Sequence, residues 1–282
     1  MKKLIICVAA LLSIGVLSAR AQDPLIPQPS TKQVITQDFG LGKITLTYSR
    51  PNVKGRKIFG AMEPYGIVWR MGANNATTIQ FTDEITIEGK KVPAGEYSFF
   101  SIPGEKEWTF ILNKTAKQWG AYGYKESDDL VRFKVPRSKA PRFTETLSMQ
   151  FTDATTSDCT LLVDWENTEV ALHFKTDVDA QVMGNIDRAM ASDKKPYYFA
   201  AIYYYNHDKD MAKALEWINI HDKAQPDAYN IKYWKARIQL KTGDKKGAIA
   251  TAKEGLKLAT DEKNAEYIRL NKEVLTQAEA AK

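Results

Sequence analysis

The sequence predicts an antiparallel β-sandwich of about nine strands, followed by an all-α region built from helical hairpins. Between residues 33 and 175, short runs alternate apolar and polar side chains, which is the period of strands with one buried face. Near Asp177 the apolar spacing changes to three and four residues, as in amphipathic helices. Nine of the eleven prolines precede this change, as expected if strands and turns give way to helices there.

The first 21 residues predict a secretory signal peptide. Lys2 and Lys3 precede an apolar run from Leu4 to Leu17, and Ala19-Arg20-Ala21 fits the rule of small residues around the cleavage position. The apolar run is shorter than the roughly 20 residues that a membrane-spanning helix needs, and no later apolar segment is longer. We therefore expect cleavage after Ala21 and an exported protein, periplasmic or secreted, without a membrane span.

Alternating apolar residues define individual strands of the predicted sandwich. Their apolar positions in four runs are Ile44, Leu46 and Tyr48; Ile79 and Phe81; Val131, Phe133 and Val135; and Leu147, Met149 and Phe151. Residues two apart lie on the same face of a strand, so each set is expected to face the core. Two-residue hairpin turns are expected at Gly89-Lys90 and at Asn167-Thr168.

About six helices are predicted after residue 177, which separates a β domain at 22–177 from a helical domain at 178–282. When the helical region is aligned with itself at an offset of 34 residues, Ala214 falls on Ala248 and one predicted turn falls on the next. Thirty-four residues is the period of tetratricopeptide repeats, so this region resembles such an array and would bind a protein partner. The alternative is a plain helical bundle that braces the sandwich.

The segment from residue 50 to residue 77 carries the densest grouping of residues suited to ligand binding. Its glycines at positions 55, 60, 66 and 72 imply positive backbone dihedrals or close approaches in a long connection. Arginine forks hold carboxylates, phosphates or sulfates bidentately, and an aromatic ring in a glycine-containing loop can stack on a sugar. The hypothesis is a glycan or small-anion site made of Arg56, Trp69, Arg70, Asn74, Thr77 and Trp119. Alternatively, the arginines pair with sandwich carboxylates such as Glu63 or Asp83.

Several short motifs together resemble one known family. They are Gly55-Arg56 to Phe59-Gly60, Trp69-Arg70 to Asn74, Pro93 to Ser98, Ile102-Pro103 before Trp108, and Asn113 followed by Trp119-Gly120. Their order and spacing are similar to those of the domain of unknown function 2911 family, exported proteins of Gram-negative bacteria. The resemblance covers roughly residues 30–175, and it implies a sandwich-like exported domain without assigning any catalytic residue.

Charge and motif content argue against several functional classes. Residues 22–177 carry 19 basic and 19 acidic side chains, and residues 178–282 carry 18 basic and 15 acidic ones, so neither part has the basic excess of a nucleic-acid-binding domain. The three histidines and two cysteines form no metal-ligand motif, and no phosphate-binding loop or dinucleotide fingerprint is present. No metal and no cofactor are therefore expected.

The leading hypothesis is an exported, non-catalytic binding protein. An alternative is a hydrolase of envelope polysaccharide or peptide that uses the loop carboxylates Glu126, Asp128 and Asp129, which are also a candidate calcium site. A third reading makes the two domains a structural scaffold of the envelope.

Overall fold

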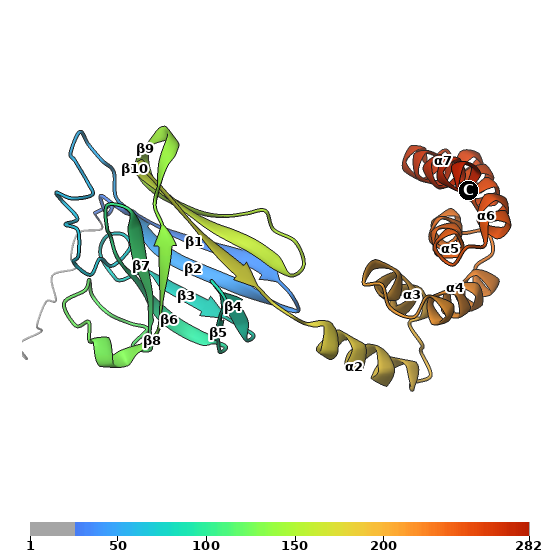
Figure 1. Ribbon diagram of the computed structural model, residues 1–282, viewed down its shortest axis with the longest axis horizontal. Coiled ribbons are helices and arrows are strands. Elements are labelled where there is room, and N and C mark those ends of the chain that lie inside the picture. The colour runs from blue at the N-terminus through green and yellow to red at the C-terminus, as the bar shows by residue number, and fades with distance from the viewer. Residues whose placement is uncertain (1–25, 282) are drawn as a thin grey trace, which may run out of the picture. The chain divides into compact units, whose positions relative to one another are not determined.

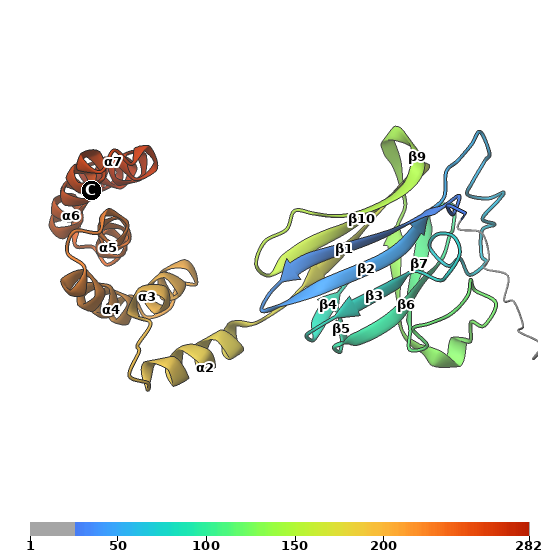
Figure 2. The same cartoon turned by 180° about the vertical axis from the view of Figure 1, so that it is seen from behind.

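The computed structural model describes residues 26–281, so the predicted signal peptide at residues 1–21 lies outside the described residues. The chain forms two compact units that divide between Asp177 and Val178. The first is built of strands and the second of helices (Figures 1 and 2). The predicted fold class, an antiparallel β-sandwich followed by a helical region, is confirmed.

Two antiparallel sheets make up the first unit, and they hold ten strands within the described residues. The six-stranded sheet has the order β1 (Thr31–Phe39), β2 (Gly42–Arg50), β3 (Thr78–Phe81), β6 (Gly95–Ile102), β7 (Glu107–Asn113) and β8 (Asp129–Pro136). The four-stranded sheet has the order β5 (Lys90–Val92), β4 (Ile85–Ile87), β10 (Asp158–Lys175) and β9 (Ser138–Thr152). A short 3-10 helix, η1 (Glu126–Asp128), precedes β8.

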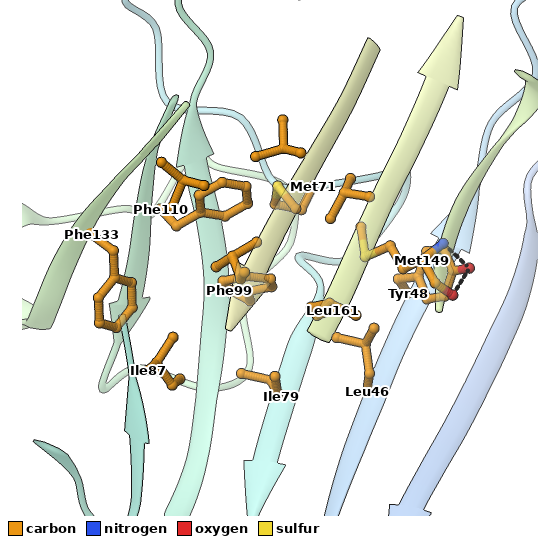
Figure 3. Packing of buried hydrophobic residues seen from close by; sticks show 14 of the residues in the cluster. Leu46, Tyr48, Met71, Ile79, Ile87, Phe99, Phe110, Phe133, Met149 and Leu161 are labelled. Atoms are coloured by element: carbon orange, nitrogen blue, oxygen red, sulfur yellow. Dashed lines mark hydrogen bonds between the residues drawn. The ribbon is translucent and has the colours of Figure 1, made fainter. Parts of the chain in front are cut away.

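Apolar side chains from both sheets form one core in this unit, and they occupy the positions that the alternation predicts. Ile44 and Leu46 of β2 are fully buried, and they belong to the same cluster as Met149 of β9. Figure 3 shows how Tyr48 joins the sheets: its hydroxyl accepts a 2.9 Å hydrogen bond from the Met149 backbone N–H. The same hydroxyl lies 2.7 Å from Gln33 Oε1, so its polar atom is satisfied inside an apolar core.

Both hairpin turns predicted from the sequence differ from the structure. The first lies one residue earlier, at Glu88 and Gly89, whose φ values of 46° and 77° suit a tight turn between β4 and β5. The second is wrong: Asn167 and Thr168 lie inside the continuous strand β10. The register against β9 shifts on both sides of Glu166, whose φ is 58°, so a bulge rather than a turn interrupts the alternation there.

The second unit consists of six helices within the described residues. They are α2 (Asp179–Met190), α3 (Tyr197–Asn206), α4 (Met211–Ala224), α5 (Tyr229–Lys241), α6 (Lys245–Asp261) and α7 (Ala265–Ala280). Asp210, Asp244 and Asn264 cap α4, α6 and α7 by accepting hydrogen bonds from backbone N–H groups of the first turn. Consecutive helices from α3 to α7 pack together, and α5 also contacts α3 and α7. No helix in the described part of the chain has the length and hydropathy for crossing a membrane.

Candidate functional site

The long connection between β2 and β3, residues 51–77, packs firmly against the sandwich. Ile58 and Met71 are fully buried in the sandwich core, and Figure 3 shows Met71 among side chains from the strands. Gly72 has a φ of 154°, and a Cβ atom there would lie 2.6 Å from the Ser49 carbonyl oxygen, so only glycine fits. Because its apolar residues anchor it, this connection holds its polar side chains in fixed places.

Two of the predicted site residues belong to the packing of this connection. Trp69 is 2% exposed; its ring stacks on Trp165 at 5.7 Å between centroids and meets Trp108 edge-on. Thr77 is fully buried, and its hydroxyl donates a 2.7 Å hydrogen bond to the Met71 carbonyl oxygen. A dissolved ligand therefore has no access to the Trp69 ring face or to the Thr77 hydroxyl, and both residues position the connection rather than touch a ligand.

Asn74 and Trp119 meet at a first cavity of about 700 Å³, here named the Trp119 cavity. Its lining residues are Gln28, Ser30, Lys32, Thr47, Tyr48, Ser49, Asn74, Asn75, Ala76, Thr78, Glu96, Ala116, Lys117, Gln118 and Trp119. Thr47 and Thr78 are paired neighbours on β2 and β3. The cavity thus combines hydroxyl and amide groups with two aromatic residues, of which Tyr48 is buried and Trp119 is 65% exposed.

Main-chain hydrogen bonds hold Trp119 beside Asn74. The Ala76 N–H donates to the Gln118 carbonyl at 3.0 Å, and the Gly120 N–H donates to the Asn74 carbonyl at 3.2 Å. These two bonds flank Trp119, in the connection between β7 and β8 (Figure 1). Asn74 has a φ of 59°, a conformation that asparagine tolerates better than most residues. The backbone that carries the exposed Trp119 ring is therefore fixed beside the cavity.

Arg56 and Arg70 lie on a second cavity of about 480 Å³, here named the Arg70 cavity. Its lining residues are Pro29, Ser30, Pro51, Asn52, Lys54, Arg56, Met62, Glu63, Arg70, Gly72 and Ala73. Ser30 is the residue that lines both cavities. The six predicted site residues are thus divided: Arg56 with Arg70 in one cavity, Asn74 with Trp119 in the other, and Trp69 and Thr77 in the packed interior.

The electrostatics of the Arg70 cavity centre on Glu63. Burial raises the pKa of its carboxyl group from 4.5 to about 7, against the opposing effects of Arg70, the Trp69 indole and Arg56. Within the described residues no ion pair or hydrogen bond engages the Arg70 guanidinium, and its Nε is buried without a partner. The alternative that this arginine is neutralised by Glu63 or Asp83 in a direct ion pair is therefore wrong for the described residues.

The loop carboxylates proposed for hydrolysis are engaged with other protein groups. Asp129 Oδ2 accepts hydrogen bonds of 2.8 Å from both the Tyr124 hydroxyl and Arg132 Nε. Glu126 forms an ion pair with Arg132 at 3.2 Å, and Asp128 accepts a 3.2 Å hydrogen bond from the Thr115 hydroxyl. In residues 26–281 no group of three or more acidic, histidine or cysteine side chains is arranged to hold a metal ion.

Sequence reasoning did not single out several residues that line the cavities. Glu63 entered only as a partner for the arginines, and Gln118, Thr47 and Thr78 did not enter at all. Thr47 and Thr78 follow from strand alternation, because they lie on the face opposite Leu46 and Ile79. Gln118 carries no comparable signal, because its position depends on how two long connections meet.

One comparison with known proteins gives a match. The family model described as protein of unknown function DUF2911 matches residues 30–174, just over half of the chain. No curated protein matches, and no solved structure matches.

Proposed function

The chain belongs to the DUF2911 family, and from this premise we propose that its β-sandwich unit is a non-catalytic binding module that takes a saccharide in the Trp119 cavity. The observation that carries the proposal is that Trp119, which is 65% exposed, lines a cavity together with hydroxyl and amide groups. An indole ring that stays exposed leaves apolar surface in contact with water, and stacking on the C–H face of a sugar would bury that surface.

The polar groups beside the ring support a ligand rich in hydroxyl groups. Asn75 brings an amide group that both donates and accepts hydrogen bonds, and Thr78 brings a hydroxyl group from the sheet. Asn74 Nδ2 already donates to the Ser30 carbonyl and to the Ser49 hydroxyl at 3.4 Å, so Asn74 offers a ligand its Oδ1 acceptor. Lys32, Lys117 and Glu96 give the cavity two positive charges and one negative charge, a modest balance that suits a neutral or weakly acidic sugar. The volume of about 700 Å³ suits a small ligand.

The proposal extends to export and to the helical unit. The pattern of residues 1–21 supports cleavage after Ala21 and a periplasmic or secreted protein, as in exported proteins of Gram-negative bacteria. Ala214 and Ala248, equivalent at the 34-residue offset, are both fully buried on the second helices of successive hairpins. This supports a tetratricopeptide-like array that recruits a protein partner while the sandwich holds the saccharide.

The saccharide site is tested with the Trp119→Ala variant. A glycan array first selects oligosaccharides that bind the wild-type protein. Each is then titrated by calorimetry into the wild type and into Trp119→Ala, where loss of the stacking surface should weaken binding about tenfold. The matched control is Tyr122→Ala, because Tyr122 is 87% exposed on the same connection and does not line the cavity. The affinity of Tyr122→Ala for each oligosaccharide should equal that of the wild type. Equal binding by Trp119→Ala, or no saccharide binding at all, would contradict the proposal.

A further inference from the structure

We propose that the Arg70 cavity is a second ligand site, separate from the saccharide site, that binds a small oxyanion through the guanidinium groups of Arg70 and Arg56. The ligand class is defined by chemistry: a sulfate, phosphate or carboxylate group that offers two or more oxygens to arginine forks. The Trp119 cavity plays no part in this binding, since the two cavities share only Ser30.

The charge lining the cavity favours an anion. Lys54, Arg56 and Arg70 face Glu63, so three positive side chains meet one acidic group. When Glu63 is protonated, three positive charges remain without any neutralising group in the lining. An oxyanion would neutralise part of this charge in an environment less polar than water, where the attraction is stronger.

Arg70 is the stronger of the two anchors. A buried guanidinium N–H without a hydrogen-bond partner loses its hydration and gains nothing in return, so this arrangement is costly to keep. An oxyanion in the cavity would supply the missing acceptor. The backbone of Arg70 is fixed, because its carbonyl accepts a 3.1 Å hydrogen bond from Thr77 N–H.

Arg56 is oriented for the same task. Its Nε donates a 2.9 Å hydrogen bond to the Val53 carbonyl, and its Nη2 donates a 2.5 Å bond to the Asn52 carbonyl. These bonds to its own connection fix the plane of the guanidinium group. No hydrogen bond within the described residues engages Nη1, so its two protons stay available to a ligand.

Glu63 makes the binding depend on pH. The charged and polar groups that face it are Arg70, Arg56, Lys54 and the Trp69 indole, and its pKa is raised by burial to about 7. The protonated carboxyl group can donate a hydrogen bond to an oxyanion, whereas the carboxylate repels it. Anion binding is therefore strongest below about pH 7 and weakens as Glu63 loses its proton.

The test uses sulfate, because sulfate keeps the same charge at every pH at which the protein is folded. Sulfate is titrated at about pH 6 and about pH 9, and the ¹⁵Nε signal of Arg70 and the heat of binding are followed. We expect the Arg70 signal to shift on binding, and the affinity to be at least about tenfold weaker at the higher pH. Parallel titrations with phosphate and acetate identify which oxyanion the cavity prefers.

Four variants separate this site from general charge effects and from the saccharide site. Arg70→Gln should weaken sulfate binding by about tenfold or more, and Glu63→Gln should keep binding while removing its pH dependence. The control Lys57→Gln removes a positive charge from the same connection outside the cavity and should bind like the wild type. Trp119→Ala should also bind sulfate normally, so failure of the saccharide site leaves this result unaffected.

Two results would overturn the proposal. One is that none of the three anions perturbs the wild-type protein. The other is that Lys57→Gln loses as much affinity as Arg70→Gln. If Arg70→Gln does not fold, the Arg70 ¹⁵Nε signal of the wild type still decides, because an unchanged signal at saturating sulfate places the anion elsewhere.

Discussion

Two arginine–carboxylate clusters in the same sandwich unit are built in opposite ways. Arg132 donates from Nε to Asp129 at 2.8 Å and from Nη2 to the Tyr124 hydroxyl at 2.7 Å, and it also pairs with Glu126. Arg70 has Glu63 beside it, yet no hydrogen bond or ion pair engages its guanidinium group within the described residues. The first cluster is complete without a ligand, whereas the second contains a cavity and unsatisfied donors.

This contrast separates a structural cluster from a candidate binding site. Residue content favours neither cluster, since both combine arginine, acidic and aromatic residues, one at the start of β8 and the other in the connection between β2 and β3. What distinguishes them is whether the guanidinium group has protein partners, because a buried N–H without a hydrogen bond costs free energy that a ligand could offset. By this criterion the Asp129 cluster is structural, and the Arg70 cluster is the one that fits the proposed oxyanion site.

The largest effect is expected when the complete cluster loses its central carboxylate. Asp129→Ala leaves the donors of Tyr124, Arg132 and Asn113 without their acceptor, and the Asp129 side chain is only 9% exposed. We expect the free energy of unfolding in urea to fall by about 3 kcal/mol. The control Glu126→Ala removes the same charge from a side chain that is 76% exposed, and it should cost less than about 1 kcal/mol. Equal losses of unfolding free energy in the two variants would show that the buried hydrogen bonds of Asp129 do not stabilise the fold.

A smaller and opposite effect is expected at Glu63, and it depends on pH. Because the folded-state pKa of about 7 lies above the ordinary 4.5, the folded chain binds more protons, and stability falls as pH rises from 4.5 to 7. The Glu63→Gln variant does not show this fall in stability, because glutamine does not ionise. The variant should match the wild type at about pH 4 and exceed its unfolding free energy by about 2 kcal/mol at about pH 8. A constant difference at both pH values would contradict the raised pKa.

Most of the fold could be predicted from the sequence, because a strand with one buried face has apolar residues at every second position. The alternation at Ile44, Leu46 and Tyr48 gives β2 its correct face, and the change of period after Asp177 coincides with the first helix. The bulge at Glu166 could not be predicted, because Asn167 and Thr168 are also typical turn residues. Only the pairing of β10 with β9 shows that the chain forms a bulge in a continuous strand rather than a hairpin turn.

The candidate site could be located from the sequence but not resolved into its parts. The clustering of arginine, tryptophan and glycine between residues 50 and 77 predicts a site on this connection, and Arg56, Arg70 and Asn74 line the two cavities there. Sequence spacing does not show which side chains point inward in an irregular segment, so Trp69 and Arg70, although adjacent, could not be assigned to core and cavity. The pairing of Asn74 with Trp119 joins two connections that are distant in sequence, and no local pattern records it.

The most direct test compares one substitution at two arginines. Arg70→Gln and Arg132→Gln are made in otherwise identical protein, and both free energies of unfolding are measured in urea without sulfate or phosphate. We expect Arg132→Gln to lose about 2 kcal/mol through its broken bonds to Asp129 and Tyr124, while Arg70→Gln stays within about 0.5 kcal/mol of the wild type or exceeds it. A loss at Arg70 as large as the loss at Arg132 would show that Arg70 is a structural residue and would contradict the account.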